Sequence, residues 1–394
     1  RVGRSIEIEQ VGARRDNPAA DTSGVNMTRD IFDVANNPEI DIVIELIGGT
    51  TIAKDLVLTA IENGKHVVTA NKALIAEYGN EIFKKAQAKG VMVAFEAAVA
   101  GGMPIIKTVR EGLSANRIDW LAGIINGTGN FIMTEMSEKG RAFDDVLAEA
   151  QALGYAEADP TFDVEGIDAA HKLTILASIA FGIRLQFERV YTEGISQISA
   201  QDVSFASELG YYIKHLGIAR RTNKGVELRV HPTLISKKQL LANVNGVMNA
   251  VITEGKPVGQ SILQGEGAGP GPTSSSSLSD LLSILRGNIK PPFGISYYKR
   301  KSIKPFNNQN YSNSLYLRFE VKDKQGVLSL ITNRLSKFKI SVKRIIQTPD
   351  KKNKKATIVI ISHKTTEKNI KNCLSIFKKN KNILKFPTLI RLYN

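Results

Sequence analysis

The sequence predicts an α/β protein that opens with a doubly wound parallel sheet and continues into an α+β region and a small sandwich-like domain. Three observations lead to this prediction. Apolar strands alternate with helices over the first hundred residues, the middle of the chain mixes both kinds of element, and the end follows the order β-α-β-β-α-β. With 394 residues, of which 42% are hydrophobic, the chain is long enough for two or three domains with separate cores.

The parallel sheet is predicted because single helices separate the strands. A near-continuous apolar strand at 41–47, closed by Gly48 and Gly49, is typical of a strand buried on both faces. A sheet of this kind that binds a dinucleotide opens with a strand, a G-x-G-x-x-G turn and a helix. No such turn precedes residue 5, so we expect that unit to lie upstream of this chain. The predicted strands are 6–11, 41–47, 66–69 and 91–95, and the helices 52–62 and 73–88.

Composition and hydrophobic periodicity divide the rest of the chain into further segments. Residues 98–264 include a strand at 225–230 and a long apolar helix at 166–181. A Gly-rich run at 265–275 leads into an apolar helix at 278–285, and we expect this stretch, about 265–286, to return to the first domain. Residues 287–313 predict a linker, rich in Pro, Asn, Lys and Tyr. Residues 314–394 predict a ferredoxin-like sandwich, with strands 315–321, 341–347, 356–362 and 388–392 and helices from 326 and at 367–380. The expected domains are therefore 1–97, 98–264 and 314–394.

Charge and cysteine content narrow the class of protein. The net charge of +15 arises in the tail, because residues 285–394 carry 26 Lys and Arg against 4 Asp and Glu. These cations alternate with apolar residues and form no nucleic-acid-binding motif, so we interpret them as a solvated surface and expect no nucleic-acid partner. The sequence has no apolar run of membrane-spanning length and no signal peptide. Together with the single cysteine, Cys373, this predicts a cytoplasmic protein without disulfides or a multi-cysteine metal site.

The most informative stretch runs from residue 153 to 172. An acidic loop that carries Glu157 and Asp163 leads into an apolar helix, on which Asp168 and Lys172 are four residues apart and share one face. Such a pair is most often a surface ion pair. Here the helix is apolar nearly all round, so we expect the pair to be buried or to face a cleft. A lysine beside carboxylates in a cleft is a suitable proton donor to a carbonyl oxygen that is being reduced.

Other positions point to a nucleotide cofactor. Lys72 follows the strand at 66–69, and open α/β sheets bind ligands at the carboxyl ends of their strands. The alternative for Lys72 is a solvated side chain, although a cation is unfavourable in the first turn of a helix. Arg14 ends the first strand, where arginine suits the 2′-phosphate of NADP. The Gly-rich run at 265–275 fits either a phosphate contact or a flexible linker.

Taken together, these motifs resemble homoserine dehydrogenase in the form that carries a C-terminal ACT domain. The resemblance covers essentially the whole chain, and many ordered matches are more specific than any single one. It implies reduction of L-aspartate 4-semialdehyde to L-homoserine by NAD(P)H, on the route to threonine, methionine and isoleucine. The matching segments are 45–49 (ELIGG), 64–74 (GKHVVTANKAL), 96–104 (EAAVAGGMP), 126–128 (NGT), 153–172, 229–233 (RVHPT), 267–269 (GAG) and 272–273 (PT).

The resemblance also implies roles for individual residues. Lys172 would donate the proton, and Glu157 and Asp168 would hold the substrate's ammonium and hydroxyl, with Asp163 nearby. A homodimer through the middle domain is implied, as is an amino-acid effector such as threonine in the C-terminal domain, where Gln325 replaces the usual Pro. The backbone carbonyls of Glu96, Val99 and Gly101 would hold a structural Na⁺ or K⁺. The residues expected at NADP(H) or NAD(H) are Gly48, Gly49, Thr69, Lys72, Gly154 and Gly269, together with Arg14 and Gly267 from the patterns above.

Two other functions stay open at this point. Aspartate-semialdehyde dehydrogenase would need a nucleophilic cysteine, but Cys373 lies on a basic helix of the tail, far from any Gly-rich turn. A degenerate enzyme that acts as an amino-acid-binding regulatory module is the second alternative. Against it, Glu157, Asp168 and Lys172 occur together although the fold requires none of them.

Overall fold

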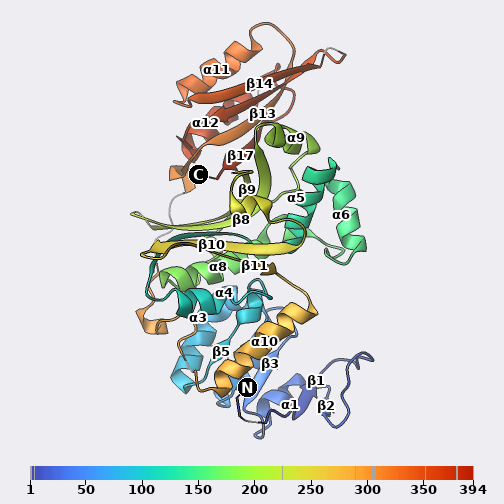
Figure 1. Ribbon diagram of the computed structural model, residues 1–394, viewed down its shortest axis with the longest axis vertical. Helices are drawn as coiled ribbons and strands as arrows, with labels where there is room; N and C mark the ends of the chain where they lie inside the picture. Colours follow the sequence, from blue (N-terminus) through green and yellow to red (C-terminus); the bar gives the residue numbers. More distant parts are fainter. Residues whose placement is uncertain are drawn as a thin grey trace.

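The computed structural model describes the whole chain except residues 1, 4, 224, 289, 303–307, 351, 379 and 394. Three tiers follow one another along the long axis: an N-terminal α/β unit, a central sheet with its helices, and a C-terminal unit (Figure 1). Among the described residues, no helix is both long and apolar enough to cross a membrane.

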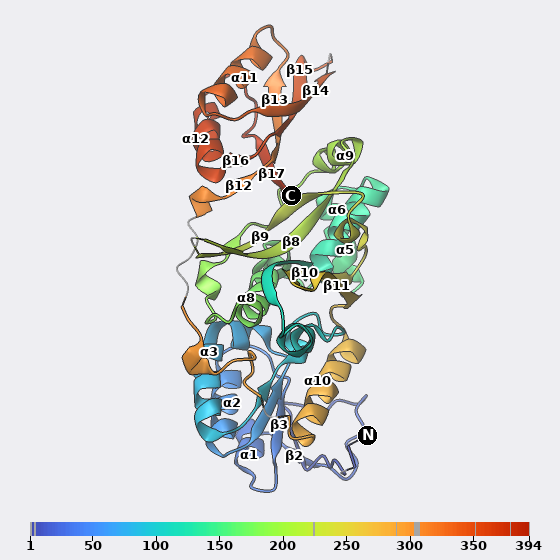
Figure 2. The same ribbon diagram turned by 60° about the vertical axis from the view of Figure 1, so that its left-hand side comes forward.

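The N-terminal unit contains a parallel sheet, as the alternation of strands and helices predicted. β3 pairs with β4 and β4 with β5, all in parallel. Helices α2 and α3 lie on one side of this sheet and α10 on the other, where Ile284 packs on Val68, Met92 and Ala94 (Figure 2). The elements are β1 (Gln10–Gly12), β2 (Asn26–Thr28), α1 (Ile31–Asn36), β3 (Ile42–Glu45), α2 (Ile52–Glu62), β4 (His66–Thr69), α3 (Lys72–Lys89), β5 (Val93–Ala94), a 3₁₀ turn (Glu96–Ala98) and α10 (Pro270–Leu285).

Several sequence predictions for this unit were wrong in extent. The alternating segment at 6–11 is not one strand: β1 includes only its last two residues and pairs with β2 alone. The side chains of Ile6 and Ile8 are 50% and 67% exposed, so the apolar face that the alternation creates does not pack on another element. The helix α1 was not predicted, and the strand expected at 91–95 is reduced to β5. The helix expected at 278–285 begins earlier, at Pro270.

In the central unit, the helix α8 lies between the central sheet and the N-terminal unit. Its sheet has the order β11-β10-β6-β8-β9, and α8 packs on β8 and β9 on one side and on α3 on the other. The elements are α4 (Ile105–Lys107), a π-turn (Thr108–Gly112), β6 (Arg117–Ile124), α5 (Gly127–Lys139), α6 (Phe143–Ala152), α7 (Thr161–Val164), α8 (Ile167–Phe181), a 3₁₀ turn (Phe187–Arg189), β7 (Tyr191–Thr192), α9 (Ala200–Glu208), β8 (Tyr211–Thr222), β9 (Gly225–Ser236), a 3₁₀ turn (Leu240–Asn243), β10 (Met248–Lys256) and β11 (Gly259–Glu266).

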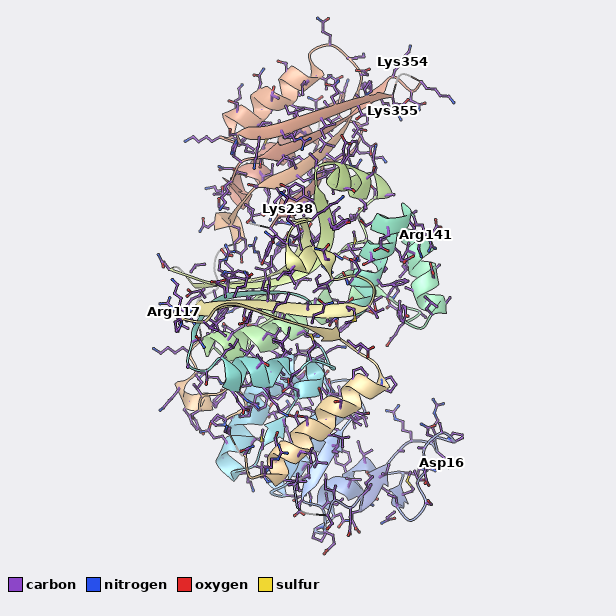
Figure 3. The ribbon with its side chains drawn as sticks, viewed as in Figure 1. Asp16, Arg117, Arg141, Lys238, Lys354 and Lys355 are labelled. Atoms are coloured by element: carbon purple, nitrogen blue, oxygen red, sulfur yellow. The ribbon has the colours of Figure 1, made fainter. Side chains whose placement is uncertain are left out.

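The C-terminal unit has the predicted β-α-β-β-α-β order. Its antiparallel strands lie in the order β17-β13-β15-β14, which is the ferredoxin-like arrangement. β17 also pairs in parallel with β9, so the sheets of the two units are continuous. Lys354 and Lys355 project from the β14–β15 end, at the opposite end of the molecule from Asp16 (Figure 3). The elements are β13 (Leu315–Lys322), α11 (Val327–Lys337), β14 (Val342–Asp350), β15 (Lys355–Ser362), β16 (Thr365–Thr366), α12 (Glu367–Phe377) and β17 (Thr388–Leu392).

The segment before this unit packs back on the N-terminal tier. It contains 3₁₀ turns (Tyr297–Lys299, Asn308–Asn310) and the short strand β12 (Ser312–Asn313), and residues 289 and 303–307 lie outside the described part. Phe293 is 2% exposed. Its ring lies edge-on to Phe83 with the centroids 4.8 Å apart, and it also contacts Phe95. This part of the segment therefore contributes to the core.

We expect Phe293→Ala to lower the free energy of unfolding by about 3–5 kcal/mol, because it empties a buried aromatic site. Urea denaturation checks this. The matched control is Tyr298→Ala, since Tyr298 is 62% exposed in the same segment and should change stability by no more than about 0.5 kcal/mol. Equal effects of the two substitutions would mean that the segment does not pack in solution.

Candidate active site

A buried carboxylate, Asp168, lies at the centre of the candidate site. It is in the first turn of α8 and 2% exposed. Lys172 Nζ donates to its Oδ2 at 2.7 Å and to the backbone oxygen of Ile125 at 2.8 Å. Lys72, the first residue of α3, places its Nζ 2.8 Å from Asp168 Oδ1. The i,i+4 pair is therefore buried, as the apolar helix predicted, and a second lysine from another domain joins it.

The charges of this cluster shift its protonation equilibria. Burial opposes ionisation of Asp168, but the charges of Lys172 and Lys72 outweigh it and hold the pKa of Asp168 well below its ordinary value. Burial lowers the pKa of Lys172, and although Asp168 opposes this, Lys72 acts in the same direction. Burial also acts against the charge on Lys72, but Asp168 outweighs it and raises the pKa of Lys72. Of the two lysines, Lys172 is therefore the one whose pKa is lowered.

Asn126 links two carboxylates and was missed as a site residue by the sequence reasoning. Its Nδ2 donates to Asp163 Oδ1 at 2.8 Å and to Asp168 Oδ2 at 2.9 Å. Its Oδ1 accepts from the backbone nitrogen of Gly129 at 2.6 Å and so caps the N-terminus of α5. The signal was present, because an Asn directly before Gly-Thr-Gly at the start of a helix indicates a cap, but the bridge to Asp163 joins distant segments.

The carboxyl ends of β3 and β4 form the surface next to this cluster. Glu45, 1% exposed, accepts from the backbone nitrogens of Ile47 and Gly48 at 2.9 and 3.1 Å and from Thr69 Oγ1 at 2.5 Å. Gly48 and Gly49 have φ values of 73° and 72°, and a Cβ on either would meet no atom within 4 Å. Hydrogen bonds to Glu45 therefore fix this turn, and the space beside its two glycines is open. Such a surface fits a cofactor that must approach the backbone closely.

A second Gly-rich surface borders the site. A Cβ on Gly267 would lie 2.1 Å from Asn249 Oδ1, so only glycine fits there, and Gly269 has a φ of 113° just before α10. The backbone nitrogen of Gly101 donates to the oxygen of Gly267 at 2.9 Å. The turn after β5, which carries Glu96, Val99 and Gly101, therefore lies beside the Gly-rich run.

The remaining predicted residues lie at the edge of the cluster or away from it. The acidic loop between α6 and α7 carries Gly154 and Glu157, both exposed, and Thr128 Oγ1 ties it to α5 by donating to the oxygen of Tyr155 at 2.5 Å. Glu157 is close enough to Lys72 to contribute to raising its pKa. Arg14 is exposed and lies just beyond β1, and no contact joins it to the cluster. Among the described residues, no group of three or more His, Cys, Asp or Glu is placed to hold a metal ion.

A parallel sheet whose strand ends face a buried lysine–carboxylate cluster defines an oxidoreductase of the nicotinamide-dependent class. Two family models match the chain: "Homoserine dehydrogenase, NAD binding domain" over residues 2–96 and "Homoserine dehydrogenase" over residues 104–282. The chain belongs to the homoserine dehydrogenase family, whose reaction interconverts L-aspartate 4-semialdehyde and L-homoserine with NAD(P)(H) in amino-acid biosynthesis.

Relatives and solved structures agree over nearly the full length. Homoserine dehydrogenase of Pseudomonas aeruginosa is 58% identical, over 95% of this chain and 88% of the relative. That of Neisseria gonorrhoeae is 48% identical, over 100% and 90%. The crystal structure of a homoserine dehydrogenase from Thiobacillus denitrificans superposes with a TM-score of 0.94 at 52% identity, over 100% of this chain and 91% of that one. The alternative of aspartate-semialdehyde dehydrogenase is therefore wrong, and Cys373 is buried in α12.

We expect Asn126→Ser to reduce kcat/KM for homoserine by about 10- to 100-fold, because hydrogen bonds to two carboxylates are lost. Serine still caps α5, so the melting temperature should stay close to that of the unmodified protein. Asn126→Ala is the matched variant: it loses the same donors and also the cap, which costs about 1 kcal/mol of stability. Steady-state kinetics and thermal melts check both. Full activity in the serine variant would reduce the role of Asn126 to helix capping.

Proposed function

We propose that Lys172 is the acid–base group of the reaction. In the reducing direction it would donate a proton to the carbonyl oxygen of the semialdehyde, and in the oxidising direction it would accept the proton of the homoserine hydroxyl. The bound nicotinamide would supply or take up the hydride. The observation that carries this proposal is the burial of Lys172 against Asp168, which fixes its Nζ in place while burial lowers its pKa.

The neighbouring carboxylates would bind the substrate's polar groups. Glu157 on the acidic loop and Asp163 at the end of α7 would attract the ammonium group, and Asp168 would orient the hydroxyl together with Lys172. Asp163 is suited to this because Asn126 holds one oxygen, at 2.8 Å, and its side chain is only partly buried. Burial raises the pKa of Asp163, so an ammonium placed beside it would be a favourable partner.

The cofactor would lie along the glycine surfaces. Gly48, Gly49 and Thr69 at the strand ends and Gly267 and Gly269 before α10 fit close backbone approach, because side chains are absent or held below the surface. Lys72 would contact the cofactor or substrate from the start of α3, and Gly154 would border the site. Arg14 favours NADP(H). A hyperthermophilic archaeal homoserine dehydrogenase, similar in fold with a TM-score of 0.56 at 28% identity, is described in complex with NADPH.

A structural Na⁺ or K⁺ would fit the turn after β5, held by the backbone oxygens of Glu96, Val99 and Gly101. Ala100 within this turn has a φ of 50°, a conformation that costs a non-glycine residue about 1–2 kcal/mol and that is often found at ligand-binding turns. Thermal melts in NaCl or KCl against choline chloride test the site, because a bound ion would raise the melting temperature only in the inorganic salts.

The wider organisation follows the same proposal. The domains would be 1–97 with the returning helix at about 265–286, 98–264, a linker at 287–313, and an ACT domain at 314–394. The ferredoxin-like strand order supports the ACT domain, which would bind an amino-acid effector such as threonine. A homodimer through the central domain and a cytoplasmic location complete the proposal. Sedimentation with and without threonine tests the homodimer and the effect of threonine on it. The alternative, a regulatory module without activity, is disfavoured by the intact lysine–carboxylate cluster.

We expect Lys172→Ala to reduce homoserine-dependent reduction of NADP⁺ and NAD⁺ by about 10²- to 10⁴-fold, the usual contribution of a general acid–base group. NADPH affinity and melting temperature should change little, because Asp168 keeps Lys72 and Asn126 as partners. Lys172→Arg is the control for charge: it preserves a cation beside Asp168 but cannot release its proton, so it should also be inactive. A large loss of stability with activity retained would assign Lys172 a structural role.

We expect Lys72→Met to shift the pH profile of homoserine oxidation to higher pH. Lys172 must be neutral to accept a proton, and the positive charge of Lys72 helps to lower its pKa. Removing that charge also leaves Lys172 as the one lysine paired with Asp168, and both changes raise the pKa of Lys172. The pH at half-maximal kcat is the measurement. Lys54→Met, which removes a lysine paired with Glu81, is the control and should leave this midpoint unchanged. A midpoint at the same or lower pH in Lys72→Met would exclude the coupling.

A further inference from the structure

One short stretch of chain contacts both the segment that carries Asp163 and the C-terminal unit. We call residues 191–202, from β7 to the first turn of α9, the connecting segment. Residues 163–166, which run from the end of α7 through the turn before α8, carry Asp163 and are called the catalytic loop here; they lead directly into α8, which bears Asp168 and Lys172. The connecting segment packs on this loop at one side and on β13 and β17 at the other. Its position is therefore set by two parts of the molecule at once.

The contact with the catalytic loop is direct. The backbone nitrogen of Ile195 donates to the oxygen of Val164 at 2.8 Å, and Ser196 Oγ donates to Glu165 Oε1 at 2.6 Å. Gly194 lies so close that a Cβ on it would meet Glu165 Oε2 at 2.3 Å. The residues on the C-terminal side of Asp163 are thus fixed to the connecting segment by a backbone hydrogen bond and by the side chain of Glu165.

The contact with the C-terminal unit depends on a buried arginine. Arg391 of β17 is 2% exposed, and its Nη1 donates to Glu193 Oε2 at 2.8 Å. Its remaining donors reach Glu367 of the C-terminal unit, at 2.5 and 3.1 Å, and the hydroxyl of Tyr191, at 3.2 Å. Tyr191 in turn donates to Glu193 at 2.8 Å. Arg391 therefore has one carboxylate partner in its own unit and one on the connecting segment.

A second ion pair fixes the far end of the connecting segment. Arg318 of β13 donates through Nε and Nη2 to the two oxygens of Asp202, at 2.6 and 2.9 Å, and Tyr316 adds a bond to Oδ1 at 3.1 Å. Asp202 is 0% exposed and also completes the capping box of α9 with Ser199. Planar two-point pairs of this kind fix orientation as well as distance.

The backbone of Glu193 joins these contacts to the sheet beneath the catalytic loop. Its nitrogen donates to the oxygen of Val230 at 2.9 Å, and its oxygen lies 2.9 Å from Nε2 of His215. Gly166, which starts α8, rests on the same two residues, because a Cβ there would lie 2.9 Å from both Val230 Cγ1 and His215 Cε1. A shift of Glu193 would therefore be transmitted to the start of α8.

We propose that Glu193 is a positioning residue for substrate binding, through which the C-terminal unit sets the place of the catalytic loop. Arg391 and Tyr191 hold the Glu193 carboxylate, the connecting segment holds Val164 and Glu165, and these hold Asp163. A change in the C-terminal unit that moves Arg391 alters the fit of the homoserine ammonium. This inference rests on the role proposed above for Asp163 and gives the C-terminal unit a direct mechanical connection to it.

The test compares two glutamates that share one arginine. Glu193→Gln weakens the interdomain pair but keeps the size of the side chain and both backbone bonds. We expect it to raise KM for homoserine by about 5- to 20-fold, within the usual range of coupling between sites, with less than a twofold change in kcat and in NADPH affinity. Glu367→Gln is the matched control: it weakens the pair within the C-terminal unit but keeps the Arg391–Glu193 pair, so it should lower the melting temperature and raise KM much less than Glu193→Gln does.

A milder variant covers the case in which Glu193→Gln fails to fold. Tyr191→Phe removes one hydrogen bond to Glu193 and should raise KM in the same direction by a smaller factor. Unchanged KM in both folded variants, or equal increases in Glu193→Gln and Glu367→Gln, would overturn the proposal. Failure of the acid–base role of Lys172 would appear separately, as turnover retained in Lys172→Ala, and would leave these KM comparisons intact.

Discussion

The buried charge of Asp168 is the constraint on which the arrangement of the molecule depends. An ionised carboxylate removed from water costs several kcal/mol unless cations and donors surround it. Asp168 takes its partners from three places: Lys172 from its own helix, Asn126 from the start of α5, and Lys72 from the N-terminal unit. The end of β4, the end of β6 and the helix between the two sheets must therefore meet at one point. Two of the groups that satisfy Asp168, Lys172 and Lys72, are also groups that we propose to contact the substrate or the cofactor.

The local part of this site could be predicted from the sequence. Asp168 and Lys172 share a helical face because of their spacing, and the apolar residues around them indicated burial. The pairing of Lys72 with Asp168 could not be predicted, since nothing in either segment marks a partner about a hundred residues away. Asn126 was overlooked for a similar reason. Its capping role is local, but its value to the site comes from two carboxylates that approach only in the folded chain.

The fold was predicted best where hydrophobic period and burial agree. In the C-terminal unit β13 alternates core residues with Arg318 and Glu320, and the six elements of the unit lie close to the expected residues. Residues 6–11 alternate equally well, yet most of them stay unpaired, because period alone does not supply a partner strand. The first half of α10 is rich in Pro, Gly and Ser and reads as a loop, but packing on the parallel sheet outweighs its weak helix propensity. In each case the deciding information lies in distant contacts.

The parallel pairing of β17 with β9 has a consequence for synthesis of the protein. Residues 388–392 leave the ribosome long after Thr233 and Leu234, their neighbours on β9. Until then β9 pairs with β7 at Arg229 and Val230 but lacks its partner strand at Thr233 and Leu234, and unpaired strand edges can recruit strands of other chains. The nascent chain must therefore keep this part of the edge protected until β17 has been made. Deletion of residues 388–392 should therefore harm the soluble yield of the whole protein more than the size of the missing strand suggests.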